Sequence, residues 1–501
     1  MFRKALLLST SLVLLVLASC GKKIESDLQK TAITIVSNQA DVVGYGFIDI
    51  ESLMEKGDFK SISTVGETIE NNYNKISRAF KVDDKMYFAF SGPLERNGMP
   101  SKIIGMATVK DKDSVRSVFN EMGYSFEEKD GKYVYYDMSS AIGIDDNLMI
   151  YVTTGFQVDS EEALNKIYAS IKLEERNERV KDILTEDGDL LIASNFKNLY
   201  GTSNTSLSML PIQQQKEIEE MVKNSHVSMK LSFNDGEMVI EQDNSRVSDK
   251  MKSAYFFKPD GAKNVVSSIG PGSPFIAMAA SFDIPKMERF LRTFNPESLK
   301  ALNASIGAGG ILLQSMSQDE NVLSMINGDI GFNLTSVDPT NISSNIPAFN
   351  AYLGLGKNGG QLKELAKAFM QNNDIDSLGN NFYRQKGSLL HMGEDAIVIH
   401  SNDSLVEIFK ITEIEQKEGM EDFGKEPLAV FIDMKELSAM QLPVPNVAQE
   451  ILGSMNYCIL TGNNEKVVFK LVMKDDSENA LNQLVTKAAE AFSSELSMFA
   501  N

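Results

Sequence analysis

The stretch that decides the fold lies near the start of the chain and runs Val42-Val43-Gly44-Tyr45-Gly46-Phe47-Ile48-Asp49-Ile50-Glu51-Ser52-Leu53. Its first part is an apolar run typical of a strand, and a helical pattern follows Asp49. Aspartate suits the position between them because its side chain accepts hydrogen bonds from the free amides of a first helical turn. The stretch therefore predicts a strand that runs directly into a helix.

A counterpart of this stretch occurs in the second half of the chain, Phe275-Ile276-Ala277-Met278-Ala279-Ala280-Ser281-Phe282-Asp283-Ile284-Pro285-Lys286-Met287. Asp283 then corresponds to Asp49 at an offset of 234 residues. Further strand-like segments match in the same order: 85–90 with 329–334, 144–150 with 393–399, and 190–196 with 428–434. The offsets drift as loop insertions would make them drift, so the sequence predicts two divergent repeats over 31–250 and 251–501.

Turns and helical segments complete the expected architecture. Hairpin turns are predicted at Asn234-Asp235-Gly236, Gly462-Asn463-Asn464 and Asp130-Gly131, because glycine and asparagine tolerate positive φ. Apolar residues at helical spacing predict helices over 113–122, 361–369 and 479–489. Short strands joined by hairpins and interrupted by helices indicate an α+β fold: two divergent repeats of mainly antiparallel sheet, with helices packed on one face.

The first twenty residues carry a targeting signal. Arg3 and Lys4 precede an apolar run over 5–17, which is too short to span a bilayer and ends in Leu17-Ala18-Ser19-Cys20. This ending resembles the bacterial lipobox, in which the chain is cleaved before the cysteine and the thiol is acylated. The alternative is an ordinary signal peptide that has a cysteine near its end. We expect a signal peptide over 1–19, lipid attachment at Cys20 and a polar tether over 20–30.

Composition limits the partners of the protein. The chain has 501 residues and a formal net charge of -20, so it would repel nucleic acid and anionic lipid headgroups. We therefore expect no nucleic-acid partner, and a membrane association that comes from acyl chains. Cys458 is the only cysteine besides Cys20, so the mature chain cannot form an internal disulfide, and we expect Cys458 to be a buried structural thiol.

One glycine pattern has the form of a nucleotide-binding motif. Gly354-Leu355-Gly356-Lys357-Asn358-Gly359 matches G-x-G-x-x-G between a strand-like and a helical segment. The corresponding stretch of the first half, 109–113, contains no glycine and connects the same kinds of element. We interpret residues 354–359 as a plain turn and expect no cofactor.

The residues that would carry catalysis or bind metals do not form a recognisable pattern. His226, His391 and His400 lack the spacing of a zinc helix. The carboxylate pairs Asp83-Asp84, Asp145-Asp146 and Asp111/Asp113 do not complete a calcium loop and suit turns. No G-x-S-x-G elbow is present, and residues 270–274 are predicted to be the loop before the second half's first strand. We expect no catalytic residue and no metal site.

The lipobox, the strand ending at Phe47 to Ile50 and the repeated strand-to-helix pattern resemble a family of uncharacterised Gram-negative envelope lipoproteins, known as a domain of unknown function. The resemblance covers most of the mature chain and implies an envelope lipoprotein without an assigned activity. It implies no catalytic residues.

Three functions remain open at this stage. The first is a non-enzymatic binding or accessory subunit, lipid-anchored to the outer membrane, facing the periplasm or the cell surface, with a possible protein partner in the envelope. An exposed apolar patch would favour it, and the 25 methionines either supply such a surface or fill the core. The second is a small-ligand or lipid-binding protein with a cleft between the halves. The third is a carboxylate-dependent hydrolase, which needs two inward carboxyl groups about 5–10 Å apart.

Overall fold

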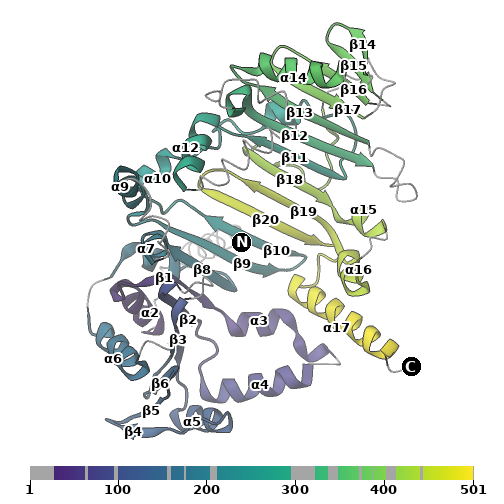
Figure 1. The fold of residues 1–501 in the computed structure, drawn as a ribbon. Helices are drawn as coiled ribbons and strands as arrows, with labels where there is room; N and C mark the ends of the chain where they lie inside the picture. The colour runs from purple at the N-terminus through teal and green to yellow at the C-terminus, as the bar shows by residue number, and fades with distance from the viewer. Residues whose placement is uncertain are drawn as a thin grey trace, which may run out of the picture.

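The computed structural model describes residues 27–62, 66–94, 100–154, 159–173, 176–202, 212–294, 322–336, 348–371, 375–385, 388–401, 413–440 and 444–499. The fold is α+β and is dominated by one large antiparallel sheet (Figure 1). Its first strands are β1 (Val42–Ile48), β2 (Met86–Leu94), β3 (Pro100–Thr108), β4 (Glu127–Lys129), β5 (Lys132–Tyr136), β6 (Ser140–Ile144), β7 (Leu148–Thr154), β8 (Leu190–Asn195), β9 (His226–Asn234) and β10 (Glu237–Asp243).

The remaining strands are β11 (Ile276–Ser281), β12 (Ile326–Ser336), β13 (Ala348–Leu355), β14 (Asp376–Gly379), β15 (Phe382–Gln385), β16 (Ser388–Met392), β17 (Ala396–His400), β18 (Leu428–Asp433), β19 (Met455–Gly462) and β20 (Lys466–Met473). The helices used below are α2 (Asp27–Asn38), α3 (Ile50–Gly57), α4 (Gly66–Ala79), α5 (Lys112–Glu121), α6 (Ser160–Ile171), α7 (Glu178–Leu184), α11 (Lys263–Val266), α14 (Gly359–Gln371), α15 (Met434–Ala439), α16 (Asn446–Gly453) and α17 (Ala480–Phe499). The three predicted hairpins and the three predicted helices are all present. The ends of the helices lie within two residues of the predicted ends, except that α17 continues ten residues further.

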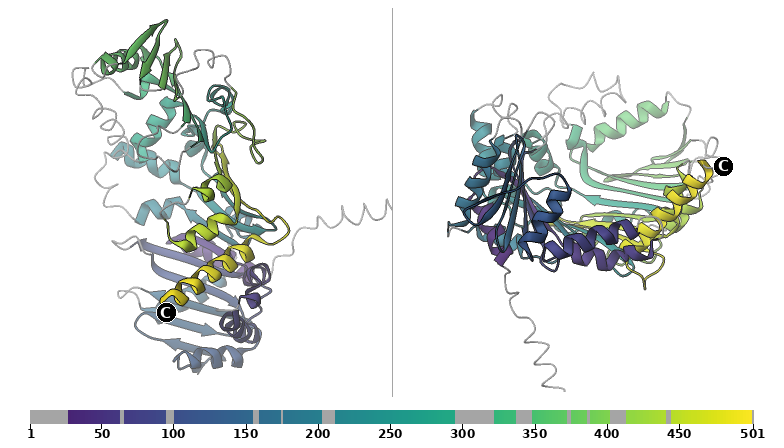
Figure 2. Two further views of the ribbon diagram at one scale, coloured as in Figure 1. Left: turned by 90° about the vertical axis from the view of Figure 1, so that its right-hand side faces the viewer. Right: turned by 90° about the horizontal axis from the view of Figure 1, so that it is seen from below.

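The pairings order the strands across the sheet. From the first-half edge the order is β4, β5, β6, β7, β3, β2, β1, β8, β9 and β10. Strand β10 pairs with β20, and the order continues through β19, β18, β11, β12, β13, β17, β16, β15 and β14. The β10–β20 pairing has ten of the described strands on each side. The long sheet is curved along its length (Figure 2).

Strand β1 shows how alternation builds the first half. Tyr45 and Phe47 are fully buried on one face of the sheet, in a core that also includes residues of α2, α6 and α7. Gly44 and Gly46 lie on the opposite face, where the rings of Phe90 and Phe88 pack against them from the neighbouring strand. The strand thus alternates large side chains, which fill the core on one face, with glycines, which leave room for the phenylalanine rings on the other.

The predicted tether over 20–30 overlaps the folded body at its end. Helix α2 begins at Asp27, and Leu28 is buried against the core of the first half. Residues 27–30 therefore belong to the folded body, because the apolar face of the helix extends to this first turn.

Helices cover both faces of the sheet, which corrects the expectation of helices on one face. Helices α2 and α6 pack on the face of Tyr45, whereas α15, α16 and α17 pack on the other face, against Phe233, Leu471 and Cys458. The physical reason is that alternate residues in these strands are apolar on both sides, so each face needs cover.

The two halves are joined rather than separated at their boundary. Strands β10 and β20 pair over seven residues, with Met238 opposite Leu471. The apolar cluster that contains Met238 and Leu471 also contains Leu53 of α3, and α17 packs against α3 (Figure 1). A separate core in the second half gathers Ala277, Ala279 and Phe431 with residues of α11.

Candidate functional site

The predicted lipid site lies outside the described residues. Cys20 and the signal peptide over 1–19 precede the first described residue, Asp27, so lipid attachment remains a prediction. Within the described part of the chain, no helix combines the length and the apolar character needed to cross a bilayer.

The glycine motif forms a turn whose amides bond within the protein. The amide of Gly356 donates to the carbonyl of Met325 (2.8 Å), and the amide of Asn358 donates to that of Ser324 (3.1 Å). A Cβ on Gly354 would collide with the side chain of Asn327, so this glycine allows close packing. These amides do not form an open cradle for a phosphate, and the turn interpretation accounts for all of these contacts.

The three histidines lie apart and have separate structural roles. His226 Nδ1 lies 3.0 Å from the Tyr45 hydroxyl, and His400 Nδ1 lies 2.7 Å from Asn350 Oδ1, both in the interior. Burial lowers the pKa of each of these two imidazoles to about 4, with the positive charge of Arg179 adding to the effect at His226. His391 stacks on Phe382. Among the described residues, no cluster of three or more histidine, cysteine or acidic side chains is arranged to hold a metal ion.

The carboxylate pairs stabilise turns and a helix start. Asp145 accepts hydrogen bonds from the amides of Asn147 and Leu148 in the β6–β7 turn. Asp111 caps α5, and Asp84 accepts a hydrogen bond from Thr108 (2.8 Å). The sequence indicated turn residues at these positions, and the geometry agrees with that role.

Cys458 lies on the face covered by α15 to α17, packed in the cluster at the junction of the halves. Burial alone raises the pKa of its thiol above the usual range. The side chain is half-buried rather than fully buried as predicted, and it is a neutral thiol at physiological pH.

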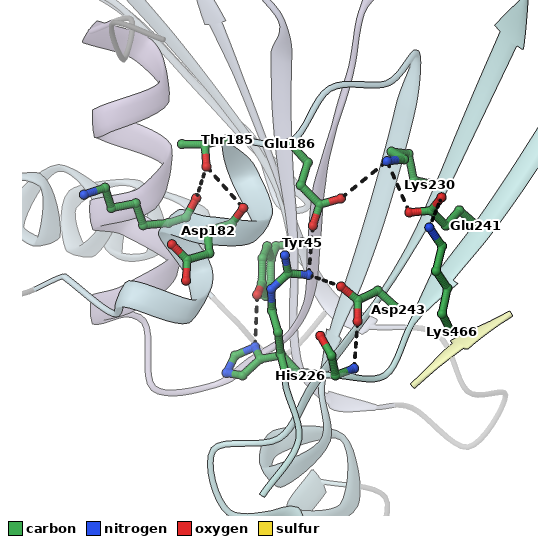
Figure 3. A network of polar contacts seen from close by, with 12 residues as sticks. Tyr45, Asp182, Thr185, Glu186, His226, Lys230, Glu241, Asp243 and Lys466 are labelled. Atoms are coloured by element: carbon green, nitrogen blue, oxygen red, sulfur yellow. Dashed lines mark hydrogen bonds and ion pairs between the residues drawn. The ribbon is translucent and has the colours of Figure 1, made fainter. Parts of the chain in front are cut away.

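A network of charged groups that the sequence did not indicate lies beside the buried Tyr45–His226 pair (Figure 3). Arg246 bonds both Glu186 (2.8 Å) and Asp243 (2.7 Å). In the same network, the ammonium groups of Lys230 and Lys466 both lie near the carboxylate of Glu241, at 3.4 and 2.8 Å respectively. Because Glu241 is on β10 and Lys466 is on β20, this second group links the two halves.

Glu186 is the carboxyl of this network with a raised pKa, caused mainly by burial and opposed by the charges of Arg246 and Lys230. A raised carboxyl pKa is a property of catalytic acids, but buried ion-pair networks produce it as well. The carboxylate here already bonds Arg246, which favours a structural role.

A second buried ion pair fixes α3 to the sheet. Asp189, with 1% of its surface exposed, accepts bonds from Lys56 Nζ at 2.7 and 2.9 Å. It also accepts from the Ser52 hydroxyl and from the amide of Phe233, both at 2.6 Å. No local sequence pattern could indicate this pair, because its members are 133 residues apart.

The strongest candidate site is an apolar pocket of about 350 Å³ on the sheet face opposite Tyr45. It lies on β1, β2, β3 and β7, beside the end of α5. Every residue that lines it, all in the described part of the chain, is apolar or aromatic: Ile48, Met86, Tyr87, Phe88, Gly105, Met106, Ala107, Phe119, Tyr124, Met149 and Tyr151. The alternation of the strands directs Phe88, Ala107 and Met149 to this face.

The apolar face continues beyond the pocket toward the second half. Gly46 lies opposite Ile192, and Ile192 lies opposite Met229, so these residues share the face that carries Phe88. Met229 is 47% exposed, an unusual fraction for a large apolar side chain in a central strand. The pocket is therefore part of a larger apolar surface, which the sequence suggested only as a methionine-rich composition.

Two other hollows in the described part of the surface are polar. A pocket of about 630 Å³ is lined by Lys417, Glu418, Glu421, Lys425 and neighbouring residues, and Lys417 already bonds Asp433 and Glu436. Another, of about 440 Å³, includes Asp41 and Lys102, which pair at 3.3 Å. Their charged groups pair within the protein, so these hollows suit a solvated surface.

Comparison with known proteins gives little similarity. No family model and no curated protein matches the chain. Among solved structures, crystal form III of TP0453 shares 11% identity at a TM-score of 0.27, covering 43% of this chain and 80% of that one. Crystal form IV shares 12% identity at 0.27, covering 42% and 79%. Similarity of this degree does not establish a shared fold or function.

Proposed function

We propose that the protein is a lipid-anchored protein of the cell envelope that acts as a non-enzymatic binding or accessory subunit. The observation that carries the proposal is the apolar pocket on β1, β2, β3 and β7, with the apolar surface that continues to Met229. Pockets of about 300–1,000 Å³ with apolar linings are typical of ligand sites. Apolar surface that monomers leave open commonly marks a place of association.

Anchoring at Cys20 is the second part of the proposal and follows from the lipobox pattern. Helix α2 begins seven residues after Cys20, a stretch that spans at most about 25 Å when fully extended. The body would therefore lie close to the membrane, which we propose to be the outer membrane. Its binding surface would be available to partners or lipids of that membrane.

We also propose that the two halves arose by internal duplication, with the boundary near residue 250. The matching strand order on either side of the β10–β20 pair supports this, as do the matching segments around Asp49 and Asp283. Duplicated scaffolds often diverge so that one copy keeps a function that the other loses.

Binding of a small ligand is a second candidate function, with the binding site in the first half rather than between the halves. The sequence suggested a cleft between the halves, but β10 and β20 join them as one sheet under a shared apolar cluster. The pocket in the first half is the better-supported place for a ligand. The hydrolase alternative has less support, because the carboxylates that the sequence singled out cap turns and helices.

The proposal is tested by purifying the tagged, lipidated protein from mildly solubilised envelopes and identifying co-purifying chains by mass spectrometry. We expect a stoichiometric partner that is lost from the Cys20→Ala protein, which should also leave the membrane fraction. Met229→Glu should release the partner, whereas the matched change Met138→Glu, at an 86% exposed position in the β5–β6 turn, should not. Finding no partner, or equal loss with both methionine variants, would contradict the accessory role.

A further inference from the structure

The pocket exists because one strand position has no side chain. Gly105 of β3 lies opposite Phe88 on one side and opposite Tyr151 on the other. A Cβ built on Gly105 would meet its nearest neighbour, Tyr151 Cβ, at 3.8 Å, which is ordinary van der Waals contact. The backbone therefore does not require glycine here, and the missing side chain leaves open space on the sheet. Close packing does require the glycine at Gly46, whose Cβ would collide with the carbonyl of Leu191.

The second half fills the corresponding position. Strand β13 occupies the place in the second half that β3 occupies in the first, and its Leu353 lies opposite Ile330 and Ile397. Leu353 and its neighbour on the same face, Ala351, which lies opposite Phe332 and Ile399, thus both carry side chains on the face where Gly105 carries none. Strand β13 therefore has no gap like the one at Gly105 among these positions, and it accommodates a leucine on this face.

The lining of the pocket selects uncharged groups. A charged group that entered would lose its hydration without gaining an ionic partner, because the lining residues are all apolar or aromatic. The polar side-chain atoms of the lining are tyrosine hydroxyls, and those of Tyr124 and Tyr151 interact with each other. They can donate to or accept from an alcohol or ester at the end of an apolar chain.

The charges next to the pocket disfavour an anionic head group. Asp49 follows the lining residue Ile48, and Asp83 and Asp84 lie shortly before the lining residue Met86. Glu51 and Glu55 on α3 add to this negative charge: burial raises the pKa of Tyr73, and the charges of these two residues and of Asp83 raise it further. A free carboxylate or phosphate at the pocket would be repelled.

We propose that this pocket binds a single hydrocarbon chain of a lipid with an uncharged head group. The proposal deepens the binding function proposed above and rests on it. The chain lies between Phe88, Ala107 and Met149, over Gly105, and the head group reaches the hydroxyls of Tyr124 and Tyr151.

The test uses 1-decanol as the probe, with calorimetric titration of the complete protein. Gly105→Leu should weaken binding by about tenfold or more, because the leucine side chain occupies the space of several methylene groups. The matched control is Gly360→Leu, at an exposed position of α14 with no atom within 4 Å of a Cβ, and it should bind 1-decanol as the unchanged protein does. Equal affinity in all three proteins, or no binding in any, would overturn the proposal.

Two further arms keep the test independent of how the variant folds. In the unchanged protein, affinity should rise by about fourfold for each methylene from 1-hexanol to 1-decanol, as expected when each group is buried. A flat series would overturn the proposal, and so would tighter binding of decanoate than of 1-decanol at pH 7. Alcohol binding does not depend on an envelope partner, so failure here is distinguishable from failure of the co-purification experiment.

Discussion

Lys56 Nζ lies 2.7 Å from Asp189 Oδ1, and this pair ties α3 of the first half to the strands at the centre of the sheet. The carboxylate side chain is 2% exposed and also holds the Phe233 amide. Because α3 in turn packs against α17, the contact helps to hold the C-terminal helix in place.

Replacing this carboxylate should destabilise the protein. Asp189→Ala leaves a partly buried ammonium and a buried amide without their partner, and we expect a loss of about 3 kcal/mol in the free energy of unfolding. The measurement is urea denaturation followed by circular dichroism. Glu121→Ala is the matched control, because Glu121 pairs with Lys75 at the surface, and we expect it to cost less than about 1 kcal/mol. Equal losses would show that Asp189 is not a structural anchor.

Replacement by alanine should destabilise the protein at Gly46 and leave its stability almost unchanged at Gly105, although both glycines lie on the pocket face. At Gly46 the added Cβ collides with the carbonyl of Leu191, so we expect Gly46→Ala to cost about 2 kcal/mol or more. At Gly105 the space is open, and Gly105→Ala should leave stability within about 0.5 kcal/mol of the original. Thermal melts of the two variants side by side check this. A large loss at Gly105 would mean that the space is not available to a ligand.

Stability should fall when the pH drops below 7, in part through His226. The folded-state pKa of this buried imidazole is about 4, below the unfolded value of about 6.5, so the unfolded chain binds more protons between these values. The contribution is therefore complete above about pH 6.5 and is lost as the pH falls toward 4. Between pH 7 and pH 5 we expect a loss of about 2 kcal/mol from this residue.

The measurement compares denaturant unfolding of the unchanged protein and of His226→Gln at both pH values. The glutamine keeps a polar partner for the Tyr45 hydroxyl and does not titrate. Its loss between pH 7 and pH 5 should therefore be smaller by about 2 kcal/mol. An identical pH dependence in the two proteins would show that His226 is not responsible.

Local patterns predicted much of the fold. The strand into Asp49, the hairpin at Asn234-Asp235-Gly236 and the loop before β11 follow from alternation, capping and turn chemistry, and all three are present. The extent of the sheet did not follow, because the pairing of β10 with β20 joins residues more than two hundred positions apart. Apolar alternation also cannot reveal which strand face a distant helix covers, so the helices on both faces were not expected.

The candidate site was largely beyond the reach of the sequence. In the sequence, Gly105 is only a glycine inside a strand-like segment. Its role in forming the pocket depends on the strand register that places it between Phe88 and Tyr151. The Lys56–Asp189 pair and the network around Arg246 also depend on long-range folding. In contrast, the turn role of Asp145 followed from local chemistry, and that of residues 354–359 followed from comparison with residues 109–113.

The most direct test of the central claim is site-specific photo-cross-linking in living cells. A benzophenone amino acid replaces either Tyr151 in the pocket or Met138, which is exposed in the β5–β6 turn. The pocket position should yield a discrete adduct, with either a lipid or an envelope protein, identified by mass spectrometry. The exposed position Met138 should not yield the same adduct. No adduct at Tyr151, or the same adducts at both positions, would contradict the account of this apolar surface as the binding site.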